Sequence, residues 1–128
     1  MKVKNKTLMD SISGLREISE KEMPYKTTLK ISKNIRLIEK IIEEYQEEYL
    51  KLTDKYLQKD ADGNYITGDT PGTFKIKDGM ENEFAEKYKT LNDFENDIDL
   101  YMIDEEDLEA ISLSPKVLMQ IDYMINMD

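Results

Sequence analysis

The sequence contains no cysteine and no histidine. Without cysteine there is no disulfide, no thiol nucleophile and no zinc–thiolate site. Without histidine the chain lacks the commonest general base of enzymes and the commonest protein ligand for transition metals. A metal ion would have to be held by oxygen ligands alone. The absence of cysteine also fits a reducing compartment such as a cytoplasm.

Long hydrophobic runs are also missing. The first residues, 1–5, are partly charged and are not followed by a long apolar stretch, so we expect no secretory signal. No segment approaches the roughly 20 apolar residues that a membrane-spanning helix needs. We therefore expect a soluble protein that does not contact a membrane.

Basic residues are absent from residues 90–115, and the acidic charge is concentrated in the same part of the chain. Residues 1–60 carry a net charge of +2, whereas residues 61–128 carry −12. The acidic residues of this stretch are Asp93, Glu95, Asp97, Asp99, Asp104, Glu105, Glu106, Asp107 and Glu109. Such a surface repels phosphate backbones, so direct nucleic-acid binding is disfavoured. It favours a basic protein partner, or it only keeps the protein soluble.

One long helix dominates the hydrophobic pattern. Apolar and aromatic residues alternate at steps of four and three, which is the seam of a coiled coil or a long bundle helix. The seam consists of Ile31, Ile35, Ile38, Ile42, Tyr45, Tyr49, Leu52 and Tyr56. Further leucines and isoleucines widen it, which favours packing within one domain over self-association alone. A homodimer through the same helix is the alternative.

The remaining pattern predicts a mostly α fold with a small β component (α+β), in which shorter helices and a β-hairpin pack on the long central helix. We expect a single domain covering residues 1–128. Its elements are a helix at 6–20, the long helix at 26–57, a β-hairpin at 64–77, a helix at 79–95, a strand at 97–103 and a C-terminal helix at 115–126.

Three local features refine this prediction. Gly14 lies inside the first helix, where a close approach by another helix would explain it. Ser114 followed by Pro115 is typical of a helix start, with an N-cap side chain and proline in the first turn. In the predicted strand the side chains alternate: Ile98, Leu100 and Met102 face one way, and Asp97, Asp99 and Tyr101 face the other.

Two motifs resemble ion or catalytic sites, and both have simpler explanations. Asp60, Asp62 and Asn64 begin like a calcium loop, but Tyr65 stands where the loop needs glycine and Pro71 where it needs glutamate. We interpret them as a turn. Asp97 and Asp99 are paired carboxylates, which we interpret as the solvent face of an edge strand. We predict no catalytic residue, no metal site and no cofactor.

Aromatic and basic residues of the long helix suggest a second kind of site. Tyr45, Tyr49 and Tyr56 either line the edge of the core or form a binding face. Four cations lie near the start of the same helix: Lys26, Lys30, Lys33 and Arg36. Near an aromatic pocket they would suit a small anionic ligand.

Four stretches together carry a resemblance to a known group. They are residues 3–8, residues 23–35, residues 59–64 and residues 111–115. In this order they resemble a family of small uncharacterised proteins from phages and prophages of low-GC Gram-positive bacteria. The resemblance implies a non-structural protein made in the cytoplasm of the infected bacterial host. It brings no catalytic residues.

The leading hypothesis is a non-enzymatic phage interaction protein that binds a host protein with a basic surface, and inhibits a defence system. We expect Asp97, Asp99, Tyr101, Asp104 and Glu105 to contact the partner. One alternative is an oligomeric sponge that sequesters a nucleotide-type signal through the four cations. Another is a virion assembly chaperone that uses the seam of the long helix.

Overall fold

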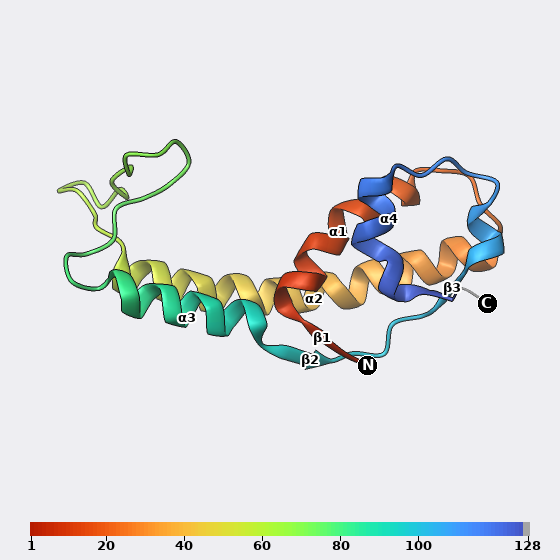
Figure 1. The fold of residues 1–128 in the computed structure, drawn as a ribbon, viewed down its shortest axis with the longest axis horizontal. Helices are drawn as coiled ribbons and strands as arrows, with labels where there is room; N and C mark the ends of the chain where they lie inside the picture. Colours follow the sequence, from red (N-terminus) through yellow and green to blue (C-terminus); the bar gives the residue numbers. More distant parts are fainter. Residues whose placement is uncertain (127–128) are drawn as a thin grey trace. The chain divides into compact units, whose positions relative to one another are not determined.

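A computed structural model describes residues 1–126 of the chain (Figure 1). It is mostly α with a small β component, as the sequence predicts. The elements in order are β1 (Lys2–Lys4), α1 (Asn5–Ser19), α2 (Tyr25–Tyr56), α3 (Glu81–Asp93), β2 (Glu95–Asp97), β3 (Ile103–Asp104), the 3-10 helix η1 (Glu105–Leu108), α4 (Pro115–Ile121), the 3-10 helix η2 (Asp122–Met124) and β4 (Ile125–Asn126).

The chain divides into two compact units where the sequence predicts one domain. The first unit combines Met1–Glu43 with the chain from Phe94 onward, and the second unit is Glu44–Asp93. Helix α2 runs through both, so each unit builds its own core on a different part of one helix. Hydrophobic periodicity cannot reveal this division, because the seam of α2 continues across it.

The long helix is confirmed, at Tyr25–Tyr56 against a prediction of 26–57. It starts after Pro24, whose carbonyl oxygen accepts the backbone N–H of Thr28 at 3.0 Å. The seam residues Ile31, Ile38 and Tyr45, which are seven positions apart in the chain, are buried. Ile35, Ile42 and Tyr49 are only half-buried. The seam therefore packs against neighbours mainly along one edge.

Helices α1 and α4 build the core of the first unit on α2. Leu8, Leu15 and Ile18 of α1 are fully buried, together with Ile121 of α4. Gly14 permits this packing, because a Cβ atom there would lie 2.8 Å from the Gln120 side-chain oxygen and 3.3 Å from Ile121 Cγ2. The close helix approach expected at Gly14 is confirmed.

The predicted strand at 97–103 is wrong as a continuous element. Strand β2 ends at Asp97, β3 begins at Ile103, and the residues between them belong to no strand. Ile98 and Leu100 are buried as the alternation predicts, but Met102 is 37% exposed and Ile103 is fully buried. The alternation of buried and exposed side chains therefore shifts by one residue at the end of the segment, so that Ile103 is buried in place of Met102.

A buried asparagine explains this interruption. The Asn34 amide nitrogen donates to the Tyr101 carbonyl oxygen at 2.8 Å, and the Tyr101 N–H donates to Asn34 Oδ1 at 2.7 Å. Asn34 is completely buried in α2. Its side chain thus satisfies both backbone groups of Tyr101, as a neighbouring strand would do. The extended segment is held to a helix at this point.

The two small sheets join distant parts of the chain. Strands β1 and β2 are antiparallel, with Val3 opposite Asn96, and the pairing continues through bonds of 2.9 and 3.0 Å between Met1 and Ile98. Strands β3 and β4 are parallel, with Ile103 opposite Ile125. The predicted C-terminal helix at 115–126 is therefore too long: α4 ends at Ile121, and the chain turns through η2 into β4.

The start of α4 agrees with the sequence. The Ser114 hydroxyl accepts the Val117 N–H at 3.2 Å, with Pro115 at the first helical position.

In the second unit, the predicted hairpin at 64–77 is present as a short antiparallel pairing. The Gly68 N–H donates to the Thr73 carbonyl oxygen and the Lys75 N–H to the Ile66 carbonyl oxygen, both at 2.8 Å, although the bridges are isolated and form no full strand. Thr67 pairs with Phe74. The segment that follows α2 pairs with the same region through two further bridges, one from Lys59 to Tyr65 and one from Leu57 to Ile76. Short, exposed ladders of this kind gain little from burial.

The helix predicted at 79–95 is shorter at both ends. It begins at Glu81, after Gly79 adopts a positive φ of 79°, and it ends at Asp93. The next residue, Phe94, offers its carbonyl oxygen to the Asn5 N–H at 2.9 Å, so the chain has already entered the β1–β2 pairing.

Helix α3 is attached to α2 mainly through aromatic rings. The ring centres are 5.8 Å apart for Tyr56 and Phe84, 5.9 Å for Phe84 and Tyr88, and 5.8 Å for Tyr88 and Tyr49. Tyr45 donates its hydroxyl to Asn92 Oδ1 at 2.6 Å. By contrast, the buried Tyr56 hydroxyl has no hydrogen-bond partner within residues 1–126.

We predict that Asn34→Ala lowers the free energy of unfolding of the first unit by about 2–3 kcal/mol, because it leaves two backbone groups of Tyr101 without partners. Urea denaturation measures the change. The control is Asn126→Ala, which removes one exposed contact of 3.4 Å to Asp104 and should cost less than about 0.5 kcal/mol. An equal effect of the two substitutions would contradict this assignment.

We predict that Tyr56→Phe leaves the stability of the second unit unchanged or raises it by up to about 1–2 kcal/mol, because it removes a buried hydroxyl that makes no hydrogen bond. Tyr45→Phe is the matched control and should lower stability by about 1 kcal/mol, since that hydroxyl is bonded to Asn92. Thermal unfolding of both variants tests the difference. A loss at Tyr56 as large as at Tyr45 would refute it.

Candidate interaction surface

The candidate surface is the acidic segment, which we define as residues 94–109 of the first unit. Its extended part turns Ile98, Leu100 and Ile103 into the core. The side chains predicted to bind a partner lie outward: Asp97, Asp99 and Glu105 are exposed, and Tyr101 is 44% exposed. The 3-10 helix η1 then carries Glu105 and its two acidic neighbours. One short stretch therefore contains eight acidic residues and no basic residue.

Few of these carboxylates are neutralised within the described part of the chain. Asp97 lies 3.8 Å from the terminal ammonium group, with 84% of its side chain exposed. Asp104 lies 3.9 Å from the Lys30 ammonium group and accepts a 3.4 Å hydrogen bond from Asn126. No ion pair is formed by Asp99 or Glu105 within residues 1–126. Exposed pairs of this kind contribute little, so the segment keeps its negative potential.

Two cations from the alternative ligand site border the acidic segment. Lys30 pairs with Asp104, and the Lys33 ammonium group lies 5.1 Å from the centre of the Tyr101 ring. On the sequence alone, the two lysines belong to a predicted ligand site, and Asp104 and Tyr101 to a separate partner-binding surface. In the structure they meet because α2 crosses under the extended segment, where Asn34 binds the Tyr101 backbone. Tyr101 is thus held by its backbone and covered on one side by a cation.

The four predicted ligand-binding cations do not form one site. Successive residues are about 100° apart around a helix, so Lys26, Lys30 and Lys33 share a face and Arg36 is turned away from Lys26 by about 80°. Lys30 and Lys33 are half-buried next to the acidic segment, whereas Lys26 and Arg36 are exposed. Of the four, Arg36 lines a pocket between α1 and α2.

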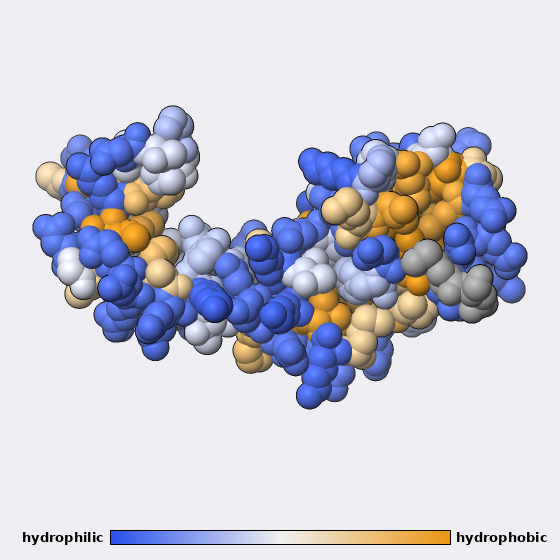
Figure 2. All heavy atoms as spheres, in the orientation of Figure 1, coloured by the Kyte–Doolittle hydropathy of each residue, from blue (hydrophilic) through white to orange (hydrophobic). Residues whose placement is uncertain are grey.

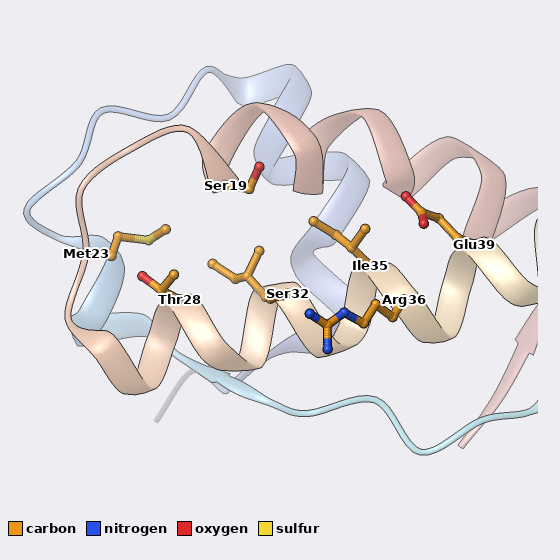
Figure 3. A pocket seen from close by; sticks show the side chains of 8 residues that line it. Ser19, Met23, Thr28, Ser32, Ile35, Arg36 and Glu39 are labelled. Atoms are coloured by element: carbon orange, nitrogen blue, oxygen red, sulfur yellow. The ribbon is translucent and has the colours of Figure 1, made fainter.

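The Arg36 pocket has a volume of about 410 Å³ and lies between α1 and the start of α2 (Figure 3). In Figure 3, Ile35 and Glu39 point from α2 toward α1, while Arg36 lies along α2 at the near rim. Glu39 is bonded to Arg16 at 3.1 Å, whereas Arg36 forms no ion pair within residues 1–126. The lining residues are Ser19, Met23, Thr28, Ile31, Ser32, Ile35, Arg36 and Glu39.

The three seam tyrosines of α2 do not form a free binding face. Tyr45 and Tyr56 are buried, and Tyr49 is half-buried between Tyr45 and Tyr88. Burial and the neighbouring Tyr88 and Tyr49 raise the pKa of Tyr45 far above the usual value for a phenol. The hydroxyl therefore stays protonated at neutral pH and serves as a hydrogen-bond donor. These residues connect α2 to α3.

Two exposed apolar residues of the acidic segment escape the sequence analysis. Phe94 is 60% exposed and precedes the exposed Glu95, and Met102 is 37% exposed and follows Tyr101. Periodicity assigns Phe94 to the preceding helix and Met102 to the buried side of a strand. The early end of α3 and the interruption of the strand turn them outward. Only knowledge of the tertiary contacts of Asn34 and Asn5 would have revealed this.

The Asp60 turn agrees with its simpler interpretation. Asp60 Oδ1 accepts the backbone N–H groups of Asp62 and Asn64 at 2.9 and 3.0 Å. This carboxylate oxygen is thus used to close the turn. Among the residues that the structure describes, no group of three or more acidic side chains is arranged to hold a metal ion.

A second surface of the first unit is apolar. Figure 2 shows apolar residues gathered over α4 and the chain next to it, among otherwise hydrophilic atoms. Helix α4 exposes 42% of Leu118 and 74% of Met119. Single exposed apolar residues are normal on protein surfaces, but adjacent ones mark a possible contact area. Among residues 1–126, Met119 in particular stays largely open to solvent.

Comparison of the chain with family models, with curated proteins and with solved structures found no match. Between residues 1 and 126, none of the helices combines the length and the apolar character that crossing a membrane requires.

Proposed function

We propose that this chain is a non-enzymatic interaction protein that binds a partner with a basic surface through the acidic segment. The observation that supports this most is a run of exposed carboxylates, with an exposed aromatic side chain at each end, on a backbone fixed to the core. Asp97, Asp99 and Glu105 provide the charge, and Phe94 and Tyr101 provide the apolar contact area. Charged residues steer association, while aromatic residues anchor an interface.

The backbone of the segment is already ordered before a partner arrives. Met1 holds Ile98 through two hydrogen bonds, and Asn34 holds Tyr101 through two more. Buried Ile98, Leu100 and Ile103 fasten the same stretch to the core. Ordering a flexible segment on binding would reduce affinity, so a preformed segment favours recognition.

The resemblance to phage and prophage proteins makes the proposal more specific. We propose that the partner is a host protein in the cytoplasm of an infected bacterium, and that binding inhibits a defence system. The density of carboxylates speaks against nucleic acid as the partner. The virion chaperone alternative receives less support, because the buried seam residues Ile31, Ile38 and Tyr45 already pack within their own units.

We predict that neutralising the acidic segment with Asp97→Asn, Asp99→Asn and Glu105→Gln together weakens binding of a captured host protein at least tenfold. The wild-type complex should also weaken steeply with added salt, because exposed charges are screened. Affinity purification from infected cells identifies the partner, and titration of the purified pair measures the affinity.

The control variant carries Glu44→Gln, Glu83→Gln and Glu86→Gln, which remove the same charge from exposed positions in the second unit. It should bind like the wild type. Equal weakening by both variants would show that only net charge matters. Binding that survives neutralisation of the acidic segment would refute the proposal.

A second candidate function rests on the Arg36 pocket. Its volume of about 410 Å³ lies in the range of small-molecule sites. One guanidinium group and the hydroxyls of Thr28 and Ser32 provide donors for an anion, and Met23 and Ile35 provide apolar surface. This arrangement suits a small ligand with one anionic and one apolar part. The ligand class is the nucleotide-type signal of the sequence analysis, but of the four cations named there only Arg36 lines this pocket.

We predict that, if this second function holds, adenosine monophosphate raises the melting temperature of the wild type as its concentration increases. Arg36→Gln should abolish the shift. Lys26→Gln removes the same charge from α2 outside the pocket and should preserve it. A shift that both substitutions reduce equally would favour a diffuse cationic face. The absence of any shift in the wild type would remove this candidate.

A further inference from the structure

Strand β2 has one paired edge and one open edge. Within residues 1–126 it belongs to a two-stranded sheet and pairs with β1 alone. The bonds between Ile98 and Met1 and from Asn5 to Phe94 establish which backbone groups face β1. In an antiparallel ladder the inward and outward groups alternate along the strand. The N–H and C=O groups of Glu95 and Asp97 therefore point away from β1.

The side chains at the same positions are acidic and exposed. Glu95 and Asp97 are exposed, as is Asp99, which follows in the same alternation. An open edge normally risks pairing with another copy of the chain. Here a second β2 would bring carboxylates opposite carboxylates, which destabilises a pair of strands. The edge is thus protected against a second copy but not against a basic strand.

Strand β1 shows what kind of strand β2 accepts. It reads Lys-Val-Lys, and its register places Lys2 opposite Asp97 and Lys4 opposite Glu95. Val3 between them is buried. Oppositely charged residues in directly opposed positions stabilise a strand pair. A strand of the same alternation on the open edge would place its own lysines opposite the same carboxylates.

From these observations we infer that the open edge of β2 binds an extended basic segment of the partner protein, by antiparallel strand addition. This inference rests on the proposed function, because it specifies how the basic partner binds. In this mode the backbone hydrogen bonds provide affinity and the alternate side chains provide specificity. The partner segment would carry Lys or Arg at every second position, opposite Glu95, Asp97 and Asp99.

A capped peptide, Lys-Val-Lys-Val-Lys, tests the inference on the intact chain. The lysine N–H groups would face β2, whereas the valine N–H groups would face away. Methylation of the lysine backbone nitrogens should therefore weaken binding at least tenfold, and methylation of the valine nitrogens should change it less than threefold. NMR titration measures both affinities and should show slowed exchange of the Glu95, Asp97 and Asp99 amide protons.

Substitution of one residue of β2 provides a second test. Asp97→Pro removes the outward N–H and the charge, whereas Asp97→Asn removes the charge alone. The proline variant should bind the peptide at least tenfold more weakly than the asparagine variant. Protection of the Ile98 amide in both variants verifies that the pairing with β1 is intact.

Three results would overturn the inference. They are equal binding of the two methylated peptides, equal binding by the proline and asparagine variants, and no binding of the unmethylated peptide. The first two would leave recognition by charge in place, so the proposed function would survive them. The proposed function itself fails only if a captured partner still binds after the acidic segment is neutralised.

Discussion

The hydrogen-bond pair between the Asn34 amide and the Tyr101 backbone is the interaction on which the functional surface depends. A helix and an extended segment rarely share backbone hydrogen bonds, because the helix uses its own internally. The Asn34 side chain makes such bonds possible. Its amide nitrogen donates to the Tyr101 carbonyl oxygen at 2.8 Å, and its amide oxygen accepts the Tyr101 N–H at 2.7 Å. Its complete burial excludes water from competing for these bonds. The extended segment can thus lie across α2 with its apolar residues inward and its carboxylates outward.

The same crossing explains why opposite charges meet at this surface. Lys30 and Lys33 project from α2 beside the segment that Asn34 holds, and they contact Asp104 and the Tyr101 ring. These contacts partly neutralise the middle of the acidic segment and restrict Tyr101. The carboxylates on both sides of it, around the open edge of β2 and on η1, keep their charge. Charges placed in this way help to orient a partner.

Local and periodic features of this fold are predictable from the sequence, whereas features that depend on distant contacts are not. The seam of α2, the close approach at Gly14 and the N-cap at Ser114 follow from spacing, size and hydrogen-bonding capacity. The prediction of a continuous strand at 97–103 is wrong because Asn34 of α2 binds the Tyr101 backbone and interrupts it. The hydrophobic pattern shows that Asn34 is polar, but it does not show which distant segment the side chain binds. The C-terminal helix fails because β4 pairs with β3, and such a parallel pairing leaves no local signal. Of the candidate site, the exposed carboxylates were predicted, but the exposure of Phe94 and Met102 required the tertiary structure.

Amide hydrogen exchange, residue by residue along the acidic segment, tests the central claim most directly. If Asn34 and Met1 hold the segment, the Tyr101 and Ile98 amide protons exchange slowly, because both are hydrogen-bonded against the core. The Asp99 amide proton between them should exchange fast. Slow exchange at Ile98 and Tyr101 with fast exchange at Asp99 is the result that the account predicts. Uniformly fast exchange across residues 98–101 would contradict it.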